Sequence, residues 1–195
     1  MATAFGETER AQIRTSLQRA AWRHACSEGM KNTSVDQLSA EAGISKGAFY
    51  HFYGSKELLF LEVLSNWHQQ IFEKVESFIT SHVDLPPDEL ARESLKTALG
   101  LLLYRPVARF LLNERDVLLR RVPQEARNQL YRSDEEIVKR LIDVCSVPLK
   151  LPLETAVGIV RVLLMSAIHA DEIGPAYDSV VHALIDSACA QFVGE

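Results

Sequence analysis

The sequence of 195 residues has few of the features that mark disulfide-bonded, β-sheet or membrane-spanning proteins. The three cysteines, Cys26, Cys145 and Cys189, lie far apart, which argues against a disulfide framework and fits a reducing cytoplasm. No alternating β-branched run is flanked by an Asn-Gly or Asp-Gly turn, so no sheet is expected. The longest apolar stretch, residues 157–170, contains Arg161 and is shorter than the about 20 residues that a membrane span needs.

Glycine (9) and proline (7) are also few, and the first ten residues have no basic and apolar leader pattern. No secretory signal is therefore expected, and a cytoplasmic location is predicted. With 47% hydrophobic and 24% charged residues, the composition is that of a globular protein and excludes a disordered or fibrous chain.

Charge is distributed unevenly along the chain. The net charge is -5, but residues 1–56 hold 7 Lys and Arg against 5 Asp and Glu, whereas residues 57–195 hold 14 against 21. A mildly basic first segment on an acidic remainder is compatible with a nucleic-acid partner, although the asymmetry is weak by itself.

Apolar residues recur at three- and four-residue steps through most of the chain, which predicts helices. Proline near helix starts and glycine after helix ends divide the pattern into segments. The sequence predicts an all-α protein of nine helices, three short ones near the start and six longer ones after them. The expected helices are 8–28, 34–42, 46–53, 56–81, 87–104, 106–121, 124–145, 153–171 and 175–193.

The segment 33–56 has the pattern of a helix-turn-helix. Two short amphipathic helices meet at Gly43, which can adopt the positive φ that a tight interhelical turn requires. Thr33 and Ser34 are both candidate N-caps, with Asp36 three residues after Thr33 as in a capping box. The second helix of such a motif lies in the DNA major groove. The alternative is a pair of packed helices without a role in DNA binding.

Small, hydroxyl-bearing and basic side chains remain outward on the second helix after its core positions are assigned. Lys46 suits phosphate or a guanine edge, and Ala48 a thymine methyl. Thr33 and Lys56 begin the flanking helices, where phosphate contacts are favoured. The candidate DNA-binding residues are Thr33, Ser45, Lys46, Gly47, Ala48, Tyr50, His51 and Lys56.

This segment resembles the signature of the Tet repressor (TetR) family. The resemblance lies in Ala-Gly-Ile-Ser-Lys-Gly at 42–47, Phe-Tyr-His-Phe at 49–52 and Ser-Lys-Glu at 55–57. It implies that Tyr50 and Lys56 bind phosphate and that Ser45, Lys46, Ala48 and His51 face the groove. Phe52 and Tyr53 depart from the usual order of residues, and Tyr53 is expected either to pack or to contact DNA.

The resemblance also implies an all-helical, two-domain homodimer, with a helix-turn-helix DNA-binding domain at 1–55 and a helical domain at 56–195 that binds a small-molecule effector and dimerises. Residues 57–195 match the family only in helix layout and length. Residues that could line an effector pocket, or equally form ordinary core, are Trp67, Ile71, Tyr104, Phe110, Tyr131, Arg161 and Met165. Arg161 either binds an anionic effector, pairs with an acid such as Asp143 or Glu172, or lies exposed.

The eighth expected helix has apolar residues on more than one side, and the ninth has one continuous apolar stripe. An isologous dimer interface is one use of this surface, and burial within one subunit is the other. The candidate interface residues are Val160, Leu164, Ala167, Tyr177, Val181, Leu184 and Ala188.

Catalysis, metal binding and cofactor binding have no recognisable motif. His169, Asp171 and Glu172 do not share one helix face, so no metal site is expected. The sequence therefore favours a homodimeric repressor that binds an inverted-repeat operator and is released by an effector. An activator or an effector-independent regulator is the alternative, and an all-helical enzyme or adaptor is a more distant one.

Overall fold

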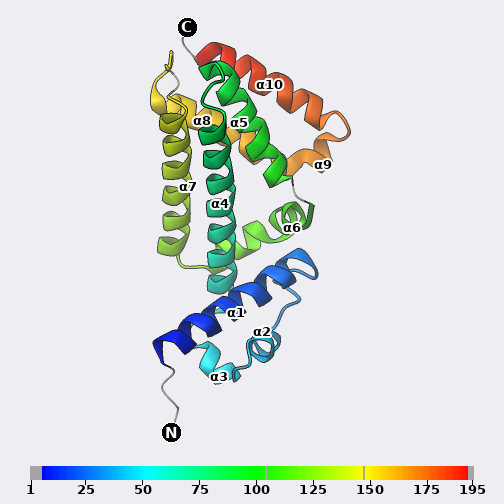
Figure 1. Ribbon diagram of the computed structural model, residues 1–195. Coiled ribbons are helices and arrows are strands. Elements are labelled where there is room, and N and C mark those ends of the chain that lie inside the picture. The colour runs from blue at the N-terminus through cyan, green and yellow to red at the C-terminus, as the bar shows by residue number, and fades with distance from the viewer. Residues whose placement is uncertain (1–5, 104, 147, 193–195) are drawn as a thin grey trace. The chain divides into compact units, whose positions relative to one another are not determined.

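A computed structural model describes residues 6–103, 105–146 and 148–192, without the side chains of residues 105–109, 111, 112 and 192. This part of the chain is helical and contains no β-strand (Figure 1). Its helices are α1 (Glu7–Cys26), α2 (Val35–Glu41), α3 (Lys46–Phe49), α4 (Lys56–Ser81), α5 (Pro87–Leu102), α6 (Arg105–Arg121), α7 (Gln124–Val144), α8 (Leu153–Ser166), η1 (Ala167–His169), α9 (Ala170–Ile173) and α10 (Tyr177–Phe192).

The predicted all-α architecture of nine helices is confirmed for the described residues. The eighth expected helix is a continuous helical stretch in which a 3₁₀ turn, η1, joins α8 to α9. Helix α4 has the predicted bounds, and α5 begins at Pro87 as expected for proline in a first turn. The third helix is shorter than predicted, because regular α-helix ends at Phe49 and residues 50–52 continue as turns.

One compact unit comprises residues 1–66 and 109–127. Helix α2 packs against both α1 and α3. The core of this unit contains fully buried residues from α1, α2, α3, α4 and α6, namely Leu17, Leu38, Phe49, Phe60 and Leu118. Residues 109–127 pack with the N-terminal helices, an association that a boundary drawn at residue 55 along the sequence does not anticipate.

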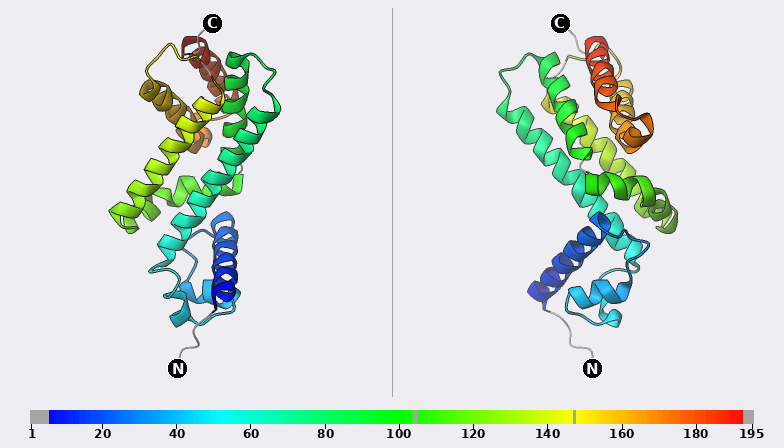
Figure 2. Two further views of the ribbon diagram at one scale, coloured as in Figure 1. Left: turned by 60° about the vertical axis from the view of Figure 1, so that its left-hand side comes forward. Right: turned by 90° about the vertical axis from the view of Figure 1, so that its right-hand side faces the viewer.

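The second compact unit comprises residues 67–108 and 128–195. Helices α5, α8 and α10 pack on one another around a core that includes Leu99, Leu163 and Ile185. Helices α4 and α7 run side by side in this unit (Figures 1 and 2), where His68 lies 2.8 Å from Asp134 and Arg140 lies 2.9 Å from Glu76.

The stretch Leu153–Ile173 passes a length and composition test for a membrane-spanning helix. Its 21 residues include a window of mean hydropathy 1.5, of which 28% is buried. The helical stretch begins at the predicted residue 153 and ends two residues after the predicted end at 171, so it is longer than the apolar run 157–170. A single helix of this kind is weak evidence for a membrane, and its residues Leu163 and Ala167 belong to the core between α5, α8 and α10.

Candidate nucleic-acid interface

The turn between α2 and α3 has the geometry that the sequence predicted. Gly43 has φ +71°, and a Cβ at this position would meet no atom within 4 Å, so the backbone conformation rather than crowding favours glycine here. The Ile44 N–H donates to the Ser39 carbonyl at 3.0 Å, which closes the turn. Ser39 is 2% exposed, as expected for a small residue at a close helix contact.

Of the two candidate caps of α2, Ser34 is the N-cap. It forms a capping box with Gln37, in place of the predicted one between Thr33 and Asp36. Thr33 is 1% exposed, and its hydroxyl donates to the Gly29 carbonyl at 2.7 Å. The predicted phosphate contact of the Thr33 side chain is therefore wrong for this conformation, because the α1–α2 loop has turned the hydroxyl inward.

Helix α3 and the turn after it have one buried face and one open face. Phe49 is fully buried, and Tyr53 is 5% exposed with its ring 6.0 Å from that of Phe49. Tyr53 therefore packs, the first of the two expected alternatives, and burial raises the pKa of its phenol to about 12. Ala48 is half-buried, whereas the other positions lie open: Ser45, Lys46, Gly47, Tyr50 and His51.

The Ser45 and Lys46 side chains already have partners within the chain. The Ser45 hydroxyl caps α3 by accepting from the Ala48 N–H at 3.2 Å. The Lys46 ammonium donates to Asp36 Oδ2 at 2.9 Å, and this hydrogen bond raises the pKa of Lys46. Both Lys46 and Asp36 are largely exposed, so phosphate could replace the carboxylate as the partner of the ammonium.

The Lys56 ammonium is directed at the α1–α2 loop. It donates to the carbonyl oxygens of Met30, at 2.8 Å, and of Thr33. Lys56 therefore anchors the first turn of α4 to this loop. A phosphate contact by Lys56 would be made in addition to these bonds or at their expense.

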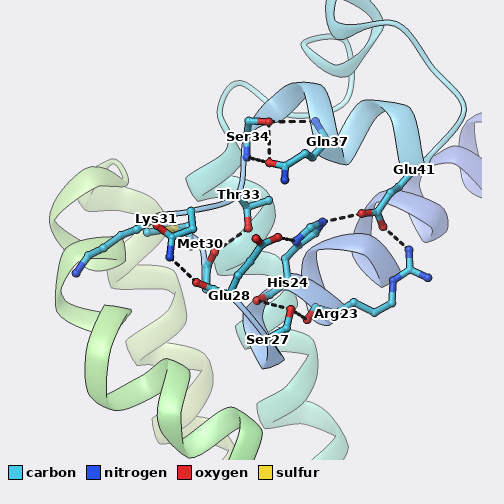
Figure 3. Close-up of polar contacts among 12 residues, drawn as sticks. Arg23, His24, Ser27, Glu28, Met30, Lys31, Thr33, Ser34, Gln37 and Glu41 are labelled. Carbon is cyan, nitrogen blue, oxygen red and sulfur yellow. Dashed lines mark hydrogen bonds and ion pairs between the residues drawn. The ribbon is translucent and has the colours of Figure 1, made fainter.

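A polar cluster joins α1 to the end of α2 (Figure 3). His24 is 9% exposed, its Nδ1 is paired with Glu28, and its Nε2 lies 2.7 Å from Glu41 Oε1. Glu41 also accepts a hydrogen bond from Arg23. Although burial opposes the change, the hydrogen bonds from Arg23 and His24 lower the pKa of the Glu41 carboxyl. This cluster fixes the orientation of α2 against α1.

Three charged residues near the candidate interface were not among the predicted interface residues. The Arg10 guanidinium lies 5.2 Å from the centroid of the Phe52 ring, Asp36 pairs with Lys46, and Glu114 reaches the α1–α2 loop from α6. The i to i+10 spacing of Asp36 and Lys46 across a predicted turn could have suggested that pair. Nothing local in the sequence relates Glu114 to residue 31.

The candidate effector residues differ in burial and belong to both compact units. Trp67 is 6% exposed and Ile71 half-buried in the second unit, whereas Phe110 belongs to the first unit and stacks on Phe60 at 6.0 Å. Tyr131 and Met165 are exposed at 41% and 47%. Tyr104 lies outside the described residues.

Arg161 forms an ion pair instead of pointing into a buried site. Its guanidinium lies 3.7 Å from Glu135, and its side chain is 41% exposed. The salt-bridge alternative therefore fits, but the acidic partner is Glu135 rather than Asp143 or Glu172. Among the described residues, no group of three His, Cys, Asp or Glu side chains could hold a metal ion.

Most of the candidate dimer residues are core residues of their own subunit. Val160, Ala167, Tyr177 and Val181 are between 3% and 5% exposed in the single chain, so assigning these four to an interface was wrong. Val160 is buried in a cluster with Val138 of α7, and Ala167, Tyr177 and Val181 are buried in the core that α8 and α10 form with α5. Leu164 and Ala188 are partly buried beside the same core, and Leu184 is 53% exposed.

A different set of apolar side chains is exposed on the same helices. Val162 (70%) and Met165 (47%) are three residues apart on α8, and Val180 (46%) and Leu184 (53%) are four apart on α10. These spacings place each pair on one helix face. We call these four residues the α8–α10 apolar face.

Sequence comparison relates part of the first compact unit to a known protein family. Residues 17–63 match the family described as "Bacterial regulatory proteins, tetR family". The uncharacterized HTH-type transcriptional regulator YuxN of Bacillus subtilis (strain 168) is 36% identical over 69 residues, covering 35% of this chain and 22% of YuxN. The transposon Tn10 TetC protein of Escherichia coli is 32% identical over 68 residues, covering 35% of this chain and 32% of TetC. The matches thus span a third or less of these relatives.

Solved structures of low sequence identity share the fold over nearly the whole chain. A putative TetR-family transcriptional regulator from Mesorhizobium loti MAFF303099 has a TM-score of 0.70 at 17% identity, covering 96% of this chain and 100% of that one. FadR from Bacillus subtilis, in complex with stearoyl-CoA, has a TM-score of 0.61 at 13% identity, covering 92% of this chain and 97% of that one. Residues 17–63 thus match the TetR family of bacterial regulatory proteins, and nearly the whole chain shares its fold with solved structures of low sequence identity.

Proposed function

We propose that this protein is a DNA-binding transcriptional regulator that represses its targets as a homodimer. The α3 segment of each subunit enters the major groove of one half-site. Because a two-fold dimer presents two such segments, the operator is an inverted repeat whose half-site centres lie about 34–36 Å apart.

The observation that carries this proposal is the open face of the α3 segment. Phe49 and Tyr53 anchor the segment in the core, while Lys46, Tyr50 and His51 remain exposed. Gly47 supports the same conclusion, because a Cβ there would meet only Ser45 Oγ, at 3.9 Å. The fold does not require a small residue at position 47, whereas close approach of a DNA backbone would.

The proposed roles divide the open face into two groups. Lys46, Tyr50 and Lys56 supply affinity through phosphate contacts, which makes binding depend strongly on salt. Ser45, Ala48 and His51 supply base preference through the groove edges. Gly47 lets the backbone approach closely.

We assign dimerisation to the α8–α10 apolar face. Its four exposed apolar residues lie on two helices that pack on each other, and large exposed apolar surface on a soluble chain marks an interaction site. The two-fold interface therefore uses Leu184 from the predicted set, with Val162, Met165 and Val180 in place of the four residues buried in the core.

We further propose that a small-molecule effector bound in the second unit releases the DNA. Helix α4 supports this role, since it begins at Lys56 beside the α1–α2 loop and continues to Trp67, which is buried in the second unit. FadR shares the fold and is described with stearoyl-CoA bound. The effector acts only if it prefers the conformation that does not bind DNA.

Selection from a pool of random duplexes tests the DNA-binding proposal. The purified protein should enrich an inverted repeat, and His51→Ala should relax the preference at one or two base pairs while retaining that repeat. Failure of the wild-type protein to enrich any sequence, together with no retention on heparin at low salt, would contradict the proposal and favour an adaptor.

A further inference from the structure

Two charged side chains hold opposite sides of one peptide group in the α1–α2 loop. The carbonyl of Met30 accepts a hydrogen bond from the Lys56 ammonium at 2.8 Å. The N–H of Lys31 donates to the Glu114 carboxylate, at 3.2 Å to Oε2 and 3.5 Å to Oε1. The Met30 carbonyl and the Lys31 N–H belong to the same peptide bond, so Lys56 and Glu114 are joined through it.

The residues of this bridge come from three distant parts of the sequence. Lys56 is the first residue of α4, Glu114 lies in α6, and the peptide group belongs to the loop between α1 and α2. All of them fall within the first compact unit. Figure 3 shows Met30, Lys31 and Thr33 succeeding one another along this loop, close to the His24 cluster.

Glu114 is buried, so its carboxylate depends on hydrogen bonds from within the protein. Glu114 is 7% exposed, and no Lys, Arg or His side chain of the described residues forms an ion pair with it. A buried carboxylate without a cation is costly unless its oxygens receive hydrogen bonds. The Lys31 N–H provides such a bond, and an ammonium on the carbonyl of the same peptide polarises that N–H and strengthens it.

The packing around Glu114 is close. A Cβ at Gly29 would lie 2.4 Å from Glu114 Oε1, and Gly29 has φ +84°. The Lys31 ammonium also donates to the carbonyl of Asn113, at 3.4 Å. The Glu114 carboxylate therefore packs directly against the loop backbone, which is possible only because residue 29 has no side chain.

We propose that Glu114 is a positioning residue for DNA binding, acting through a Lys56–peptide–Glu114 bridge that fixes the α1–α2 loop and the start of α4. Its partner is the Met30–Lys31 peptide group, not DNA. The role in DNA binding rests on the function proposed above, whereas the bridge itself does not.

A double-mutant cycle in protein stability tests the bridge without DNA. Glu114→Gln keeps the shape and one acceptor oxygen but removes the charge, and Lys56→Met keeps the apolar stem but removes the ammonium. Each single substitution should increase the equilibrium constant for unfolding. Because the two residues share one bridge, the increase in the double variant should be smaller than the product of the two single increases, by at least about threefold. Additive effects would overturn the bridge.

A matched cycle and a local probe separate the bridge from general destabilisation. Glu114→Gln combined with Lys46→Met should be additive, because Lys46 pairs with Asp36 outside the loop. In NMR spectra, Lys56→Met should move the Lys31 amide proton upfield, since it loses the polarising ammonium across its peptide group. An unchanged Lys31 resonance would contradict the proposal.

Operator titrations then test the positioning role. Glu114→Gln should weaken binding several-fold with an unchanged salt slope, because Glu114 touches no phosphate, whereas Lys56→Met should lower the slope by about one. Unchanged affinity in Glu114→Gln would remove the positioning role and leave the bridge. Failure of the wild-type protein to bind any duplex would instead contradict the proposed function.

Discussion

At the scale of single residues, the open face of the α3 segment holds side chains whose existing partners bear on DNA affinity. The Lys46 ammonium is bound to the Asp36 carboxylate at 2.9 Å in the free protein. Phosphate binding must replace this partner or share the ammonium with it. Asp36 therefore lowers the gain from a phosphate contact, both as a competitor for Lys46 and as a negative charge at the interface.

Lys46→Ala should weaken binding to specific and random duplexes alike and reduce the salt slope by about one. Asp36→Asn should have the opposite effect and tighten binding by about twofold to fivefold, the range expected for an exposed ion pair. Titrations by fluorescence anisotropy at several salt concentrations measure both. If Asp36→Asn tightens binding equally in a Lys46→Ala background, the pair is not the cause.

Gly47→Ala should separate stability from DNA binding. Its Cβ has space in the free protein, and alanine favours helix over glycine by up to about 1 kcal/mol, so the variant should be as stable as the wild type or more stable. DNA affinity should nevertheless fall, by about tenfold if the added methyl costs about 1.4 kcal/mol against the DNA backbone. Thermal unfolding and operator titration of the same preparation test this, and unchanged affinity would show that position 47 does not face DNA.

At the scale of elements, the α1–α2 loop connects α1, α2, α4 and α6. Lys56 and Glu114 hold its backbone, Thr33 closes it through the Gly29 carbonyl, and Gly29 gives it a left-handed turn. The loop thereby sets where α2 begins, and α2 in turn packs against α3.

Gly29→Ala and Gly43→Ala form a matched pair that isolates the contact with Glu114. Both positions have positive φ, which costs a non-glycine residue about 1–2 kcal/mol. Only the Cβ at position 29 would meet another group, Glu114, so Gly29→Ala should lower the free energy of unfolding by at least about 1 kcal/mol more than Gly43→Ala. Urea denaturation measures the difference, which should shrink in a Glu114→Ala background; equal costs would rule out the close packing.

The contact between α1 and α2 should weaken in acid. The pKa of the Glu41 carboxyl is below its ordinary 4.5, so the carboxylate stabilises the fold above about pH 4.5, and this contribution is lost as the pH falls through the lower pKa of the folded state. Glu41→Gln should therefore lose less stability than the wild type between about pH 6 and about pH 3. Glu125→Gln, on an exposed carboxyl without an ion pair among the described residues, is the control and should behave as the wild type.

Element boundaries followed from local signals where such signals exist. Pro87, Ser45 and Gly43 mark helix starts or a turn in both the sequence and the structure. The sequence left two candidate caps for α2, because Thr33 and Ser34 are both good caps by type, and only the inward bond of Thr33 to Gly29 decides between them.

At the scale of the whole molecule, the proposed function uses two surfaces of the described residues: the α3 face for DNA and the α8–α10 apolar face for a second subunit. The apolar residues of α8 indicated that this helix is covered on more than one side, and those of α10 indicated one continuous packing stripe. These patterns did not show which residues face the chain's own core, since that depends on where α5 lies.

Leu184→Arg should convert the protein to a monomer, because a guanidinium on a buried apolar interface is left without a partner. Operator affinity should fall at least about tenfold, since two half-sites are then no longer bound by one assembly. Val83→Arg, at a position 66% exposed after the end of α4, is the control and should change neither property. Sedimentation velocity gives the oligomeric state; a Leu184→Arg protein that remains dimeric would show that the interface lies elsewhere.

The sequence by itself determined the all-helical class, the position of the helix-turn-helix and the residues on its open face, because periodicity, caps and turn glycines act over a few neighbouring residues. Only the tertiary structure decided that Thr33 faces inward, that Val160 and Val181 are core, and that Glu114 reaches the Met30–Lys31 peptide group. These facts depend on contacts between residues far apart in the chain, which no local pattern encodes.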